Sequence, residues 1–184
     1  MQKIIRRRES STPSGLGNAD LHPLLARVYA GRGVRSAAEL DLGLARLIPP
    51  DELLHSDQAA GLLADALAAQ EHILIVGDYD ADGATSTALA LSALRAFGAE
   101  RVSYLVPNRF EYGYGLTREI VELAIANGAP DVIVTVDNGI SSIDGVIAAR
   151  DAGIRTLITD HHLAGSVLPD ADVIVNPNQP DCGF

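Results

Sequence analysis

Apolar residues follow two alternating patterns along the second two-thirds of the chain. Short continuous apolar runs, typical of buried strands, occupy residues 72–76, 101–106, 131–136, 155–158 and 172–175. Apolar residues spaced three and four apart predict helices over 59–70, 84–97, 117–127 and 143–152, and Asp57 is the expected N-cap of the first. Strands that alternate with helices favour right-handed crossovers, so we expect an α/β fold with a mostly parallel β-sheet of about five strands flanked by helices.

The first 55 residues carry shorter patterns. Residues 1–18 are basic and then rich in serine, proline and glycine, which is typical of a flexible lead-in. Apolar spacing predicts short helices over 21–30 and 36–47. We therefore expect a small N-terminal helical arm over 19–55, followed by the main α/β lobe over 56–184.

Composition and charge narrow the class of protein. The chain has 184 residues, of which 47% are hydrophobic, and a formal net charge of −10. Cys182 is its one cysteine, and no signal peptide or apolar run of about 18 residues is visible, so we expect a soluble, cytoplasmic protein without a membrane contact. The acidic balance by itself argues against nucleic-acid binding, unless bound metal ions or a partner supply positive charge.

Three aspartates directly follow the first predicted strand. Asp78, Asp80 and Asp82 alternate with other residues before a glycine, and carboxylates this close repel one another unless a cation offsets them. Hard oxygen ligands suit magnesium or manganese. Taken alone the triplet is equally compatible with a calcium loop, a turn or a catalytic site. An EF-hand is disfavoured because its twelfth position, counted from Asp78, is Leu89.

Two further strand ends carry polar groups. Asp137 follows the third predicted strand, and Asp160, His161 and His162 follow the fourth. Each could be an ordinary turn, but the carboxyl ends of parallel strands share one edge of the sheet, so all three groups are expected to meet there. A nitrogen ligand shifts the preference towards manganese, and two metal ions roughly 3.5–4 Å apart can clamp a phosphoryl group and generate hydroxide. We interpret the edge as a two-metal phosphoryl-transfer site.

These three motifs resemble a known family. Residues 78–83 (DYDADG), 137–139 (DNG) and 160–162 (DHH) are similar to motifs one to three of the DHH phosphoesterase family. Residues 106–110, 113–116 and 176–180, and even 21–27 with 32–33, are similar to its single-stranded-DNA-specific exonucleases. The resemblance runs from about residue 20 almost to the end, and it implies a DHH-type catalytic lobe over the α/β part.

The resemblance also implies metal ligands. Asp80 and Asp82 are implied as ligands from the first motif, with Asp78 beside them as a ligand or as a group behind the ligands. Asp137 is implied to bridge two metal ions, and His161 to complete a metal site. The implied cofactors are Mn²⁺ or Mg²⁺.

Substrate contacts follow from the same resemblance. His162 is implied to face the scissile phosphate or to orient a neighbour, and Asp160 to fix the histidine pair rather than to bind metal. Asn108 and Arg109 are candidates for gripping a phosphate, since a planar guanidinium suits a bidentate contact. Tyr112 and Tyr114 could stack on bases, although packing is the slightly favoured interpretation.

The implied function is a metal-dependent 5′-to-3′ exonuclease that acts on single-stranded DNA in repair and recombination. The resemblance suggests single-strand-binding protein and a helicase as partners, and we expect a monomer. The alternatives are a small-substrate phosphoesterase of the family, whose members usually begin the first motif with histidine where this chain has Asp78, or an inactive nucleic-acid or partner-binding scaffold. Because family exonucleases continue into a fourth motif, a DHHA1 lobe and an OB-fold, we expect this sequence to be an N-terminal portion that is inactive alone.

Overall fold

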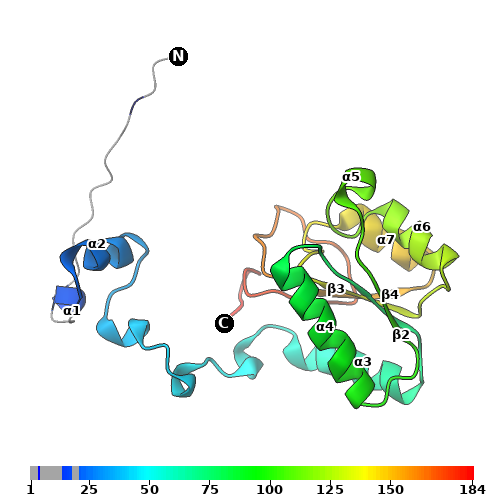
Figure 1. Ribbon diagram of the computed structural model, residues 1–184, viewed down its shortest axis with the longest axis horizontal. Coiled ribbons are helices and arrows are strands. Elements are labelled where there is room, and N and C mark those ends of the chain that lie inside the picture. The colour runs from blue at the N-terminus through cyan, green and yellow to red at the C-terminus, as the bar shows by residue number, and fades with distance from the viewer. Residues whose placement is uncertain (1–3, 5–13, 18–20) are drawn as a thin grey trace. The chain divides into compact units, whose positions relative to one another are not determined.

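The computed structural model describes residue 4, residues 14–17 and residues 21–184 (Figure 1). The chain divides into two compact units, Met1–Ile48 and Pro49–Phe184. The second unit contains the whole sheet and all of the predicted site residues, so it is the part that matters for function.

The first unit is helical. Its elements are α1 (Ser14–Gly17), α2 (Pro23–Gly31) and the 3₁₀ turns η1 (Ala37–Leu40) and η2 (Leu44–Arg46). The helix predicted over 36–47 is therefore wrong as a single element, because two short turns replace it. Ser36 and Glu39 form a capping box at the first turn, and the Asp41 side chain accepts from the main-chain N–H of Gly43 at 3.0 Å between the two turns.

The predicted lead-in reaches only partly into the described residues. Its last described part is α1, where Leu16 is only 1% exposed. Apart from residue 4, the remainder of the lead-in lies outside the described residues, as do residues 19 and 20 of the predicted arm.

The second unit is built on a five-stranded parallel sheet. All five predicted strands are confirmed, as β1 (Ile73–Val76), β2 (Val102–Leu105), β3 (Val132–Val136), β4 (Arg155–Thr159) and β5 (Val173–Val175). The strand order is β2-β1-β3-β4-β5, and every neighbouring pair is parallel. The predicted α/β fold class is confirmed.

Helices cover both faces of this sheet, which explains why its central strands are continuously apolar. Ile73 and Ile75 pack towards α3 (Ser56–Ala68) and α4 (Ala81–Ala96). Leu74 and Val76 pack towards α6 (Arg118–Ala126) and α7 (Ile143–Asp151), which lie on the opposite side of the sheet in Figure 1. Two shorter elements complete the unit, η3 (Pro50–Glu52) and α5 (Arg109–Tyr112).

Two helix starts differ from prediction. Helix α4 begins at Ala81, three residues earlier than expected, because the Asp80 carboxylate accepts from the main-chain N–H of Gly83 at 3.3 Å and acts as its N-cap. Helix α3 begins at Ser56 after His55, whose backbone is left-handed with φ of 65°. The prediction that Asp57 caps this helix is wrong, and Asp57 lies in its first turn.

The strand order creates a crevice at one edge of the sheet. After β1 the chain moves outward to β2, then returns past β1 to place β3 on its other side. Open α/β sheets bind ligands where the order reverses in this way, outside the carboxyl ends of the strands. The motifs that follow β1 and β3 therefore lie at the switch point between these strands.

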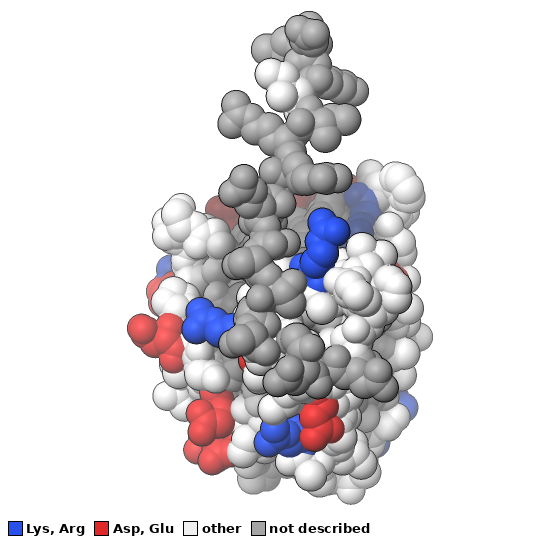
Figure 2. Space-filling model, turned by 90° about the vertical axis from the view of Figure 1, so that its left-hand side faces the viewer, with Lys and Arg blue, Asp and Glu red and all other residues white. Residues whose placement is uncertain are grey.

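One face of the molecule carries side chains of both charges. On the face drawn in Figure 2, acidic and basic side chains both occur, and neither sign forms a continuous patch among the residues that are coloured. None of the helices in the described segments has the length and apolar character needed to cross a membrane.

Close packing of α7 against the start of α6 yields a stability prediction. A Cβ atom on Gly145 would lie 2.0 Å from the carbonyl oxygen of Leu116, so Gly145→Ala should lower the free energy of unfolding by about 1–3 kcal/mol. Gly61 in α3 has no atom within 4 Å of such a Cβ, so Gly61→Ala should raise it by about 0.5–1 kcal/mol. Urea denaturation followed by circular dichroism measures the free energy of unfolding of both variants. Equal changes in the two variants would contradict the predicted clash at Gly145.

Candidate active site

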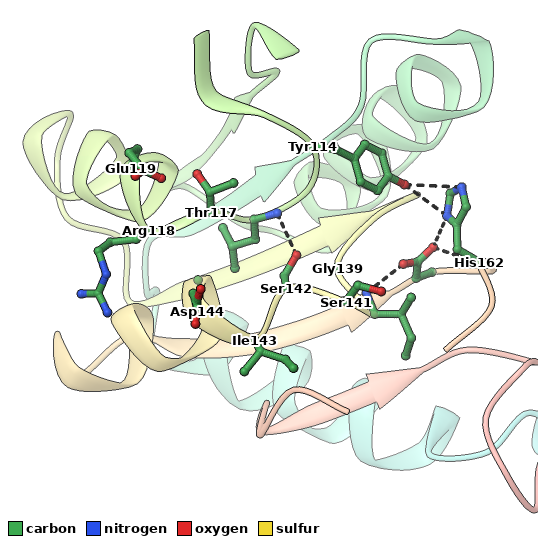
Figure 3. Close-up of a pocket in the computed structure, with 14 residues that line it drawn as sticks. Tyr114, Thr117, Arg118, Glu119, Gly139, Ser141, Ser142, Ile143, Asp144 and His162 are labelled. Atoms are coloured by element: carbon green, nitrogen blue, oxygen red, sulfur yellow. Dashed lines mark hydrogen bonds and ion pairs between the residues drawn. The ribbon is translucent and has the colours of Figure 1, made fainter. Parts of the chain in front are cut away.

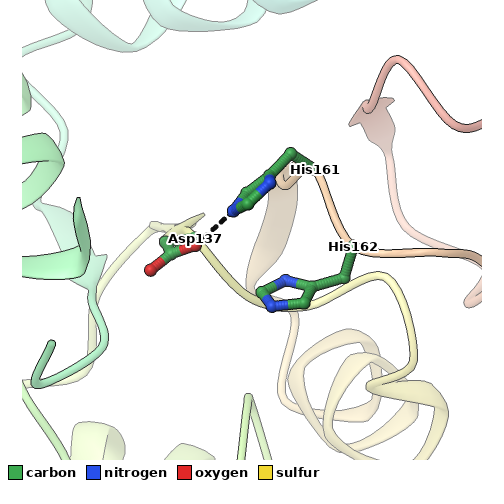
Figure 4. Close-up of side chains that lie close together, drawn as sticks. All are labelled: Asp137, His161 and His162. Carbon is green, nitrogen blue, oxygen red and sulfur yellow. Dashed lines mark hydrogen bonds and ion pairs between the residues drawn. The ribbon is translucent and has the colours of Figure 1, made fainter. Parts of the chain in front are cut away.

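The predicted carboxylates and imidazoles meet at the carboxyl ends of β1, β3 and β4. Single ligand atoms from Asp78, Asp80 and Asp137 lie within 4.8 Å of one another, and so do atoms from Asp137, His161 and His162. Asp137 belongs to both groups. Figure 4 shows its carboxylate facing the ring of His161, with His162 beside them.

The start of α4 places the carboxylates of Asp80 and Asp82 next to the crevice. Gly83 lies so close to the end of β1 that a Cβ atom there would be 2.6 Å from the main-chain oxygen of Asp78. This approach brings Asp82, in the first turn of α4, to 3.8 Å between its Oδ2 and Nε2 of His161. Because the amino end of a helix carries partial positive charge, Asp80 and Asp82 are favourably placed there.

Asp137 occupies an unusual backbone conformation. Its φ is 63°, in the left-handed region that non-glycine residues rarely adopt, while its N–H still donates to the Thr159 carbonyl at 3.1 Å. The buried side chain of Asn138 holds this turn by donating to the carbonyls of Val76 at 3.1 Å and Val136 at 2.9 Å. Sequence reasoning missed this role of Asn138, although an amide between two strand ends is a recognisable signal.

Asp160 organises the histidine pair. Its Oδ1 accepts from the main-chain N–H of His161 at 2.7 Å and of His162 at 3.1 Å, and lies 2.7 Å from Nδ1 of His162. Its Oδ2 accepts from the N–H of Ile140 at 2.9 Å. With both oxygens engaged and the side chain 1% exposed, Asp160 is placed to orient the histidines from behind.

Two side-chain amides hold the main chain of the histidine pair. Asn176, which is fully buried, donates from its side chain to the His162 carbonyl at 3.0 Å. The Asn178 side chain donates to the His161 carbonyl. The sequence marked this stretch only by resemblance, so this supporting role was also missed.

Arg109 lies against the other side of the cluster. Its guanidinium contacts both oxygens of Asp78, with Nε 2.9 Å from Oδ1, and its Nη2 is 3.6 Å from Oδ2 of Asp80. The Arg109 Cζ atom lies 4.2 Å from the ring centroid of Tyr79 and 4.8 Å from that of Tyr114. Asp78 also accepts from the Tyr79 N–H at 2.8 Å, so its carboxylate is already well satisfied by protein groups.

The other residues predicted near the substrate differ in placement. The side-chain oxygen of Asn108 caps α5 by accepting from the Phe110 N–H at 3.1 Å, and the side chain is exposed. Tyr112 packs against the core beneath α6 and α7. Tyr114 instead reaches the cluster, and its hydroxyl donates to the Asp137 carbonyl at 3.2 Å.

The electrostatics reflect crowded negative charge. Burial raises the pKa of Asp137 above its usual value, and the Asp82 and Asp80 carboxylates act in the same direction, whereas the hydrogen bond to His161 opposes them. The hydrogen bond to Asp160 raises the pKa of His162. Burial, reinforced by nearby carboxylates, raises the pKa of Tyr114 to about 12, so its phenol keeps its proton at neutral pH.

The donor set fits a divalent cation. Arg109 already places positive charge beside Asp78 and Asp80, whereas within the described residues the ion-pair contacts of Asp82 and Asp137 are to His161. Carboxylate oxygens together with an imidazole nitrogen suit manganese or magnesium. A cation at the Asp82, Asp137 and His161 side would offset the carboxylate repulsion that adds to the effect of burial on the Asp137 pKa.

Two cavities adjoin these groups. One of about 240 Å³ is lined by Asp82, Ser86, Asp137, Thr159 and His161, among others, and so lies directly on the proposed cation side. A larger one of about 790 Å³ lies along the starts of α6 and α7 and meets the cluster at Tyr114, Asp160 and His162 (Figure 3). Its size is within the range of small-molecule sites.

Comparisons with known proteins identify a family and similar sequences. The family described as "DHH family, N-terminal domain" matches residues 72–183. The single-stranded-DNA-specific exonuclease RecJ of Salmonella typhimurium is 53% identical over 183 residues, and RecJ of Haemophilus influenzae is 50% identical over 184. Each alignment covers 100% of this chain and 31% of the relative, so the chain spans about a third of the length of these curated relatives.

Solved structures are also similar. A crystal structure of exonuclease RecJ bound to manganese superposes with a TM-score of 0.63 and 34% identity, covering 74% of this chain and 36% of that one. RecJ in complex with Mn²⁺ from Thermus thermophilus gives a TM-score of 0.65 and 32% identity, covering 93% of this chain and 23% of that one.

The hydrogen bonds of Asp160 predict a stability effect. Asp160→Ala removes the acceptor of the buried Ile140 N–H and of both histidine N–H groups, so the free energy of unfolding should fall by about 1–3 kcal/mol. Asp170→Ala is the matched control, because Asp170 has 83% of its side chain exposed and pairs only with the exposed Arg150 among the described residues. Chemical denaturation measures both, and a loss no larger than that of the control would contradict the role of Asp160.

Proposed function

The chain belongs to the DHH family, and from that premise we propose that it forms the catalytic lobe of a metal-dependent exonuclease specific for single-stranded DNA. The observation that supports this most directly is the sharing of Asp137 by two groups of ligand atoms at the β1–β3 switch point. The RecJ relatives carry this activity in their names, and the small-substrate alternative has no comparable support.

We propose that Mn²⁺ or Mg²⁺ binds at this cluster. Asp80, Asp82, Asp137 and His161 are the proposed ligands, and Asp137 is the one able to bridge two ions because it belongs to both groups. Asp78 is proposed to support the ligands without binding metal itself, since Arg109 and a main-chain N–H already satisfy its carboxylate. Bound divalent ions would stabilise charge on the phosphoryl group and activate water for attack.

The protein's own residues supply the remaining functions. Arg109 presents a fixed positive charge beside the crevice, and its planar fork suits a phosphate oxygen as well as Asp78. The hydrogen bond to Asp160 holds the ring of His162 and raises its pKa, and this ring is the proposed contact to the scissile phosphate. Asn108 offers its amide N–H groups to the same strand of DNA.

The resemblance extends the proposal beyond the site. It supports 5′-to-3′ polarity, a role in repair and recombination in the cytoplasm, and single-strand-binding protein and a helicase as partners of a monomeric enzyme. These features stand as proposals, because the names of the relatives state only an exonuclease specific for single-stranded DNA.

A nuclease assay tests the proposed activity. In the natural protein, Asp82→Ala should reduce cleavage of single-stranded DNA in Mn²⁺ by at least about 100-fold, because even groups behind metal ligands cost 10–100-fold. The fold should be unaffected, since 67% of the Asp82 side chain is exposed. Asp170→Ala serves as the control. Normal turnover in Asp82→Ala would refute the metal assignment, and cleavage confined to dinucleotides would favour a small-substrate phosphoesterase.

Calorimetry tests metal binding without any substrate. Titration of Mn²⁺ into the 184-residue chain should give saturable binding that disappears in Asp137→Ala, because that change removes the ligand shared by both groups. Binding that persists unchanged in Asp137→Ala would contradict the bridging role. An absence of binding to the unmodified chain would contradict the proposed metal site.

A further inference from the structure

We propose that Tyr114 is a positioning residue that holds the phosphate-binding side of the site in register with its metal-binding side. The inference rests on the proposed function, because it assigns Arg109 to the phosphate and Asp137 to the metal. The Tyr114 hydroxyl contacts Asp137 and the Tyr114 ring lies against Arg109, so one side chain contacts both sides.

The local sequence forces Tyr114 into the crevice. Gly113 and Gly115 both have φ of 77°, a left-handed conformation that other residues adopt only with strain. A Cβ atom on Gly115 would also lie 2.8 Å from Oγ of Ser142, which accepts from the Leu116 N–H at 2.9 Å. The chain therefore turns sharply on both sides of Tyr114 and projects its ring towards His162, as Figure 3 shows.

The hydroxyl group of Tyr114 reaches the metal-binding side. It donates to the Asp137 carbonyl at 3.2 Å, at the residue whose own backbone is left-handed. The same oxygen lies 3.3 Å and 3.4 Å from the two ring nitrogens of His162, and the two rings meet edge to face with centroids 5.8 Å apart. One hydroxyl group thus contacts both the turn that presents Asp137 and the second histidine.

The ring of Tyr114 reaches the phosphate-binding side. It lies 4.8 Å from Cζ of Arg109, whose guanidinium also lies 4.2 Å from the Tyr79 ring and contacts the Asp78 carboxylate. Arginine side chains are long and lose considerable freedom when fixed, so two aromatic rings and a carboxylate together restrict where the charge can point.

This arrangement makes the two sides interdependent. In-line attack requires the phosphate and the metal ligands to be placed correctly relative to each other, and a displacement of about 1 Å can cost about 100-fold in rate. Arg109 and Asp137 are 28 residues apart, and Arg109 begins α5 whereas Asp137 follows β3. Contact of both with Tyr114 restricts their relative movement.

Kinetic variants separate the two contacts. In the natural protein, Tyr114→Phe keeps the ring and removes the hydroxyl, so kcat on single-stranded DNA should fall about tenfold with KM within about twofold. Tyr114→Leu also removes the ring, so KM should rise in addition. Tyr112→Phe is the matched control, because Tyr112 packs against the core two residues away. Parental kcat in Tyr114→Phe, or equal KM in the Phe and Leu variants, would overturn the proposal.

A measurement without substrate keeps the inference distinct from the proposed function. Nuclear magnetic resonance of the 184-residue chain should show a sharp Nε–H signal from Arg109 that persists in Tyr114→Phe and broadens in Tyr114→Leu and Gly115→Ala. In Tyr114→Phe the Asp137 and Asn138 amide signals should shift. If the parent does not cut DNA, the exonuclease proposal fails alone. An unchanged Arg109 signal in Tyr114→Leu would refute the role of Tyr114.

Discussion

Negative charge gathered at the end of a parallel sheet is the constraint on which this structure depends. Asp78, Asp80 and Asp137 lie within reach of one another because β1 and β3 are neighbours, although 57 residues separate Asp80 from Asp137 in the sequence. Their repulsion is compensated on one side by Arg109, which engages Asp78. On the other side the ion-pair contact of Asp137 among the described residues is with His161, and a divalent cation would supply compensating charge.

The rest of the second unit restricts the movement of these charged groups. The sheet is buried on both faces, so the strand ends cannot move without disturbing two layers of close-packed apolar side chains. Buried polar groups then fix the loops, through Asn138 between the strands and Asp160 behind the histidines. The Asn138 side chain donates to two main-chain carbonyls and Asp160 accepts from three main-chain N–H groups, which ties the loop conformation to the register of the sheet.

Local sequence signals were accurate where one element decides its own structure. The five strands are apolar runs too short to be helices, and all five are present. Local signals failed where competing contacts decide the outcome. Asp80 ends as a helix cap because Gly83 allows α4 to approach the end of β1, and His55 displaces Asp57 as the residue before α3 by taking a left-handed backbone. Neither the approach of α4 to β1 nor the backbone conformation of His55 can be predicted from the spacing of apolar residues.

The sequence by itself determined the fold class, the family and the residue types at the strand ends, because strand periodicity and short motifs are local and chemically distinctive. Only the tertiary structure decided which of these residues share a site. Strand order, which no local pattern encodes, places the switch point between β1 and β3. The same long-range packing turned Asp78 towards Arg109, and it brought Tyr114 to Asp137, where the sequence suggested only base stacking or packing.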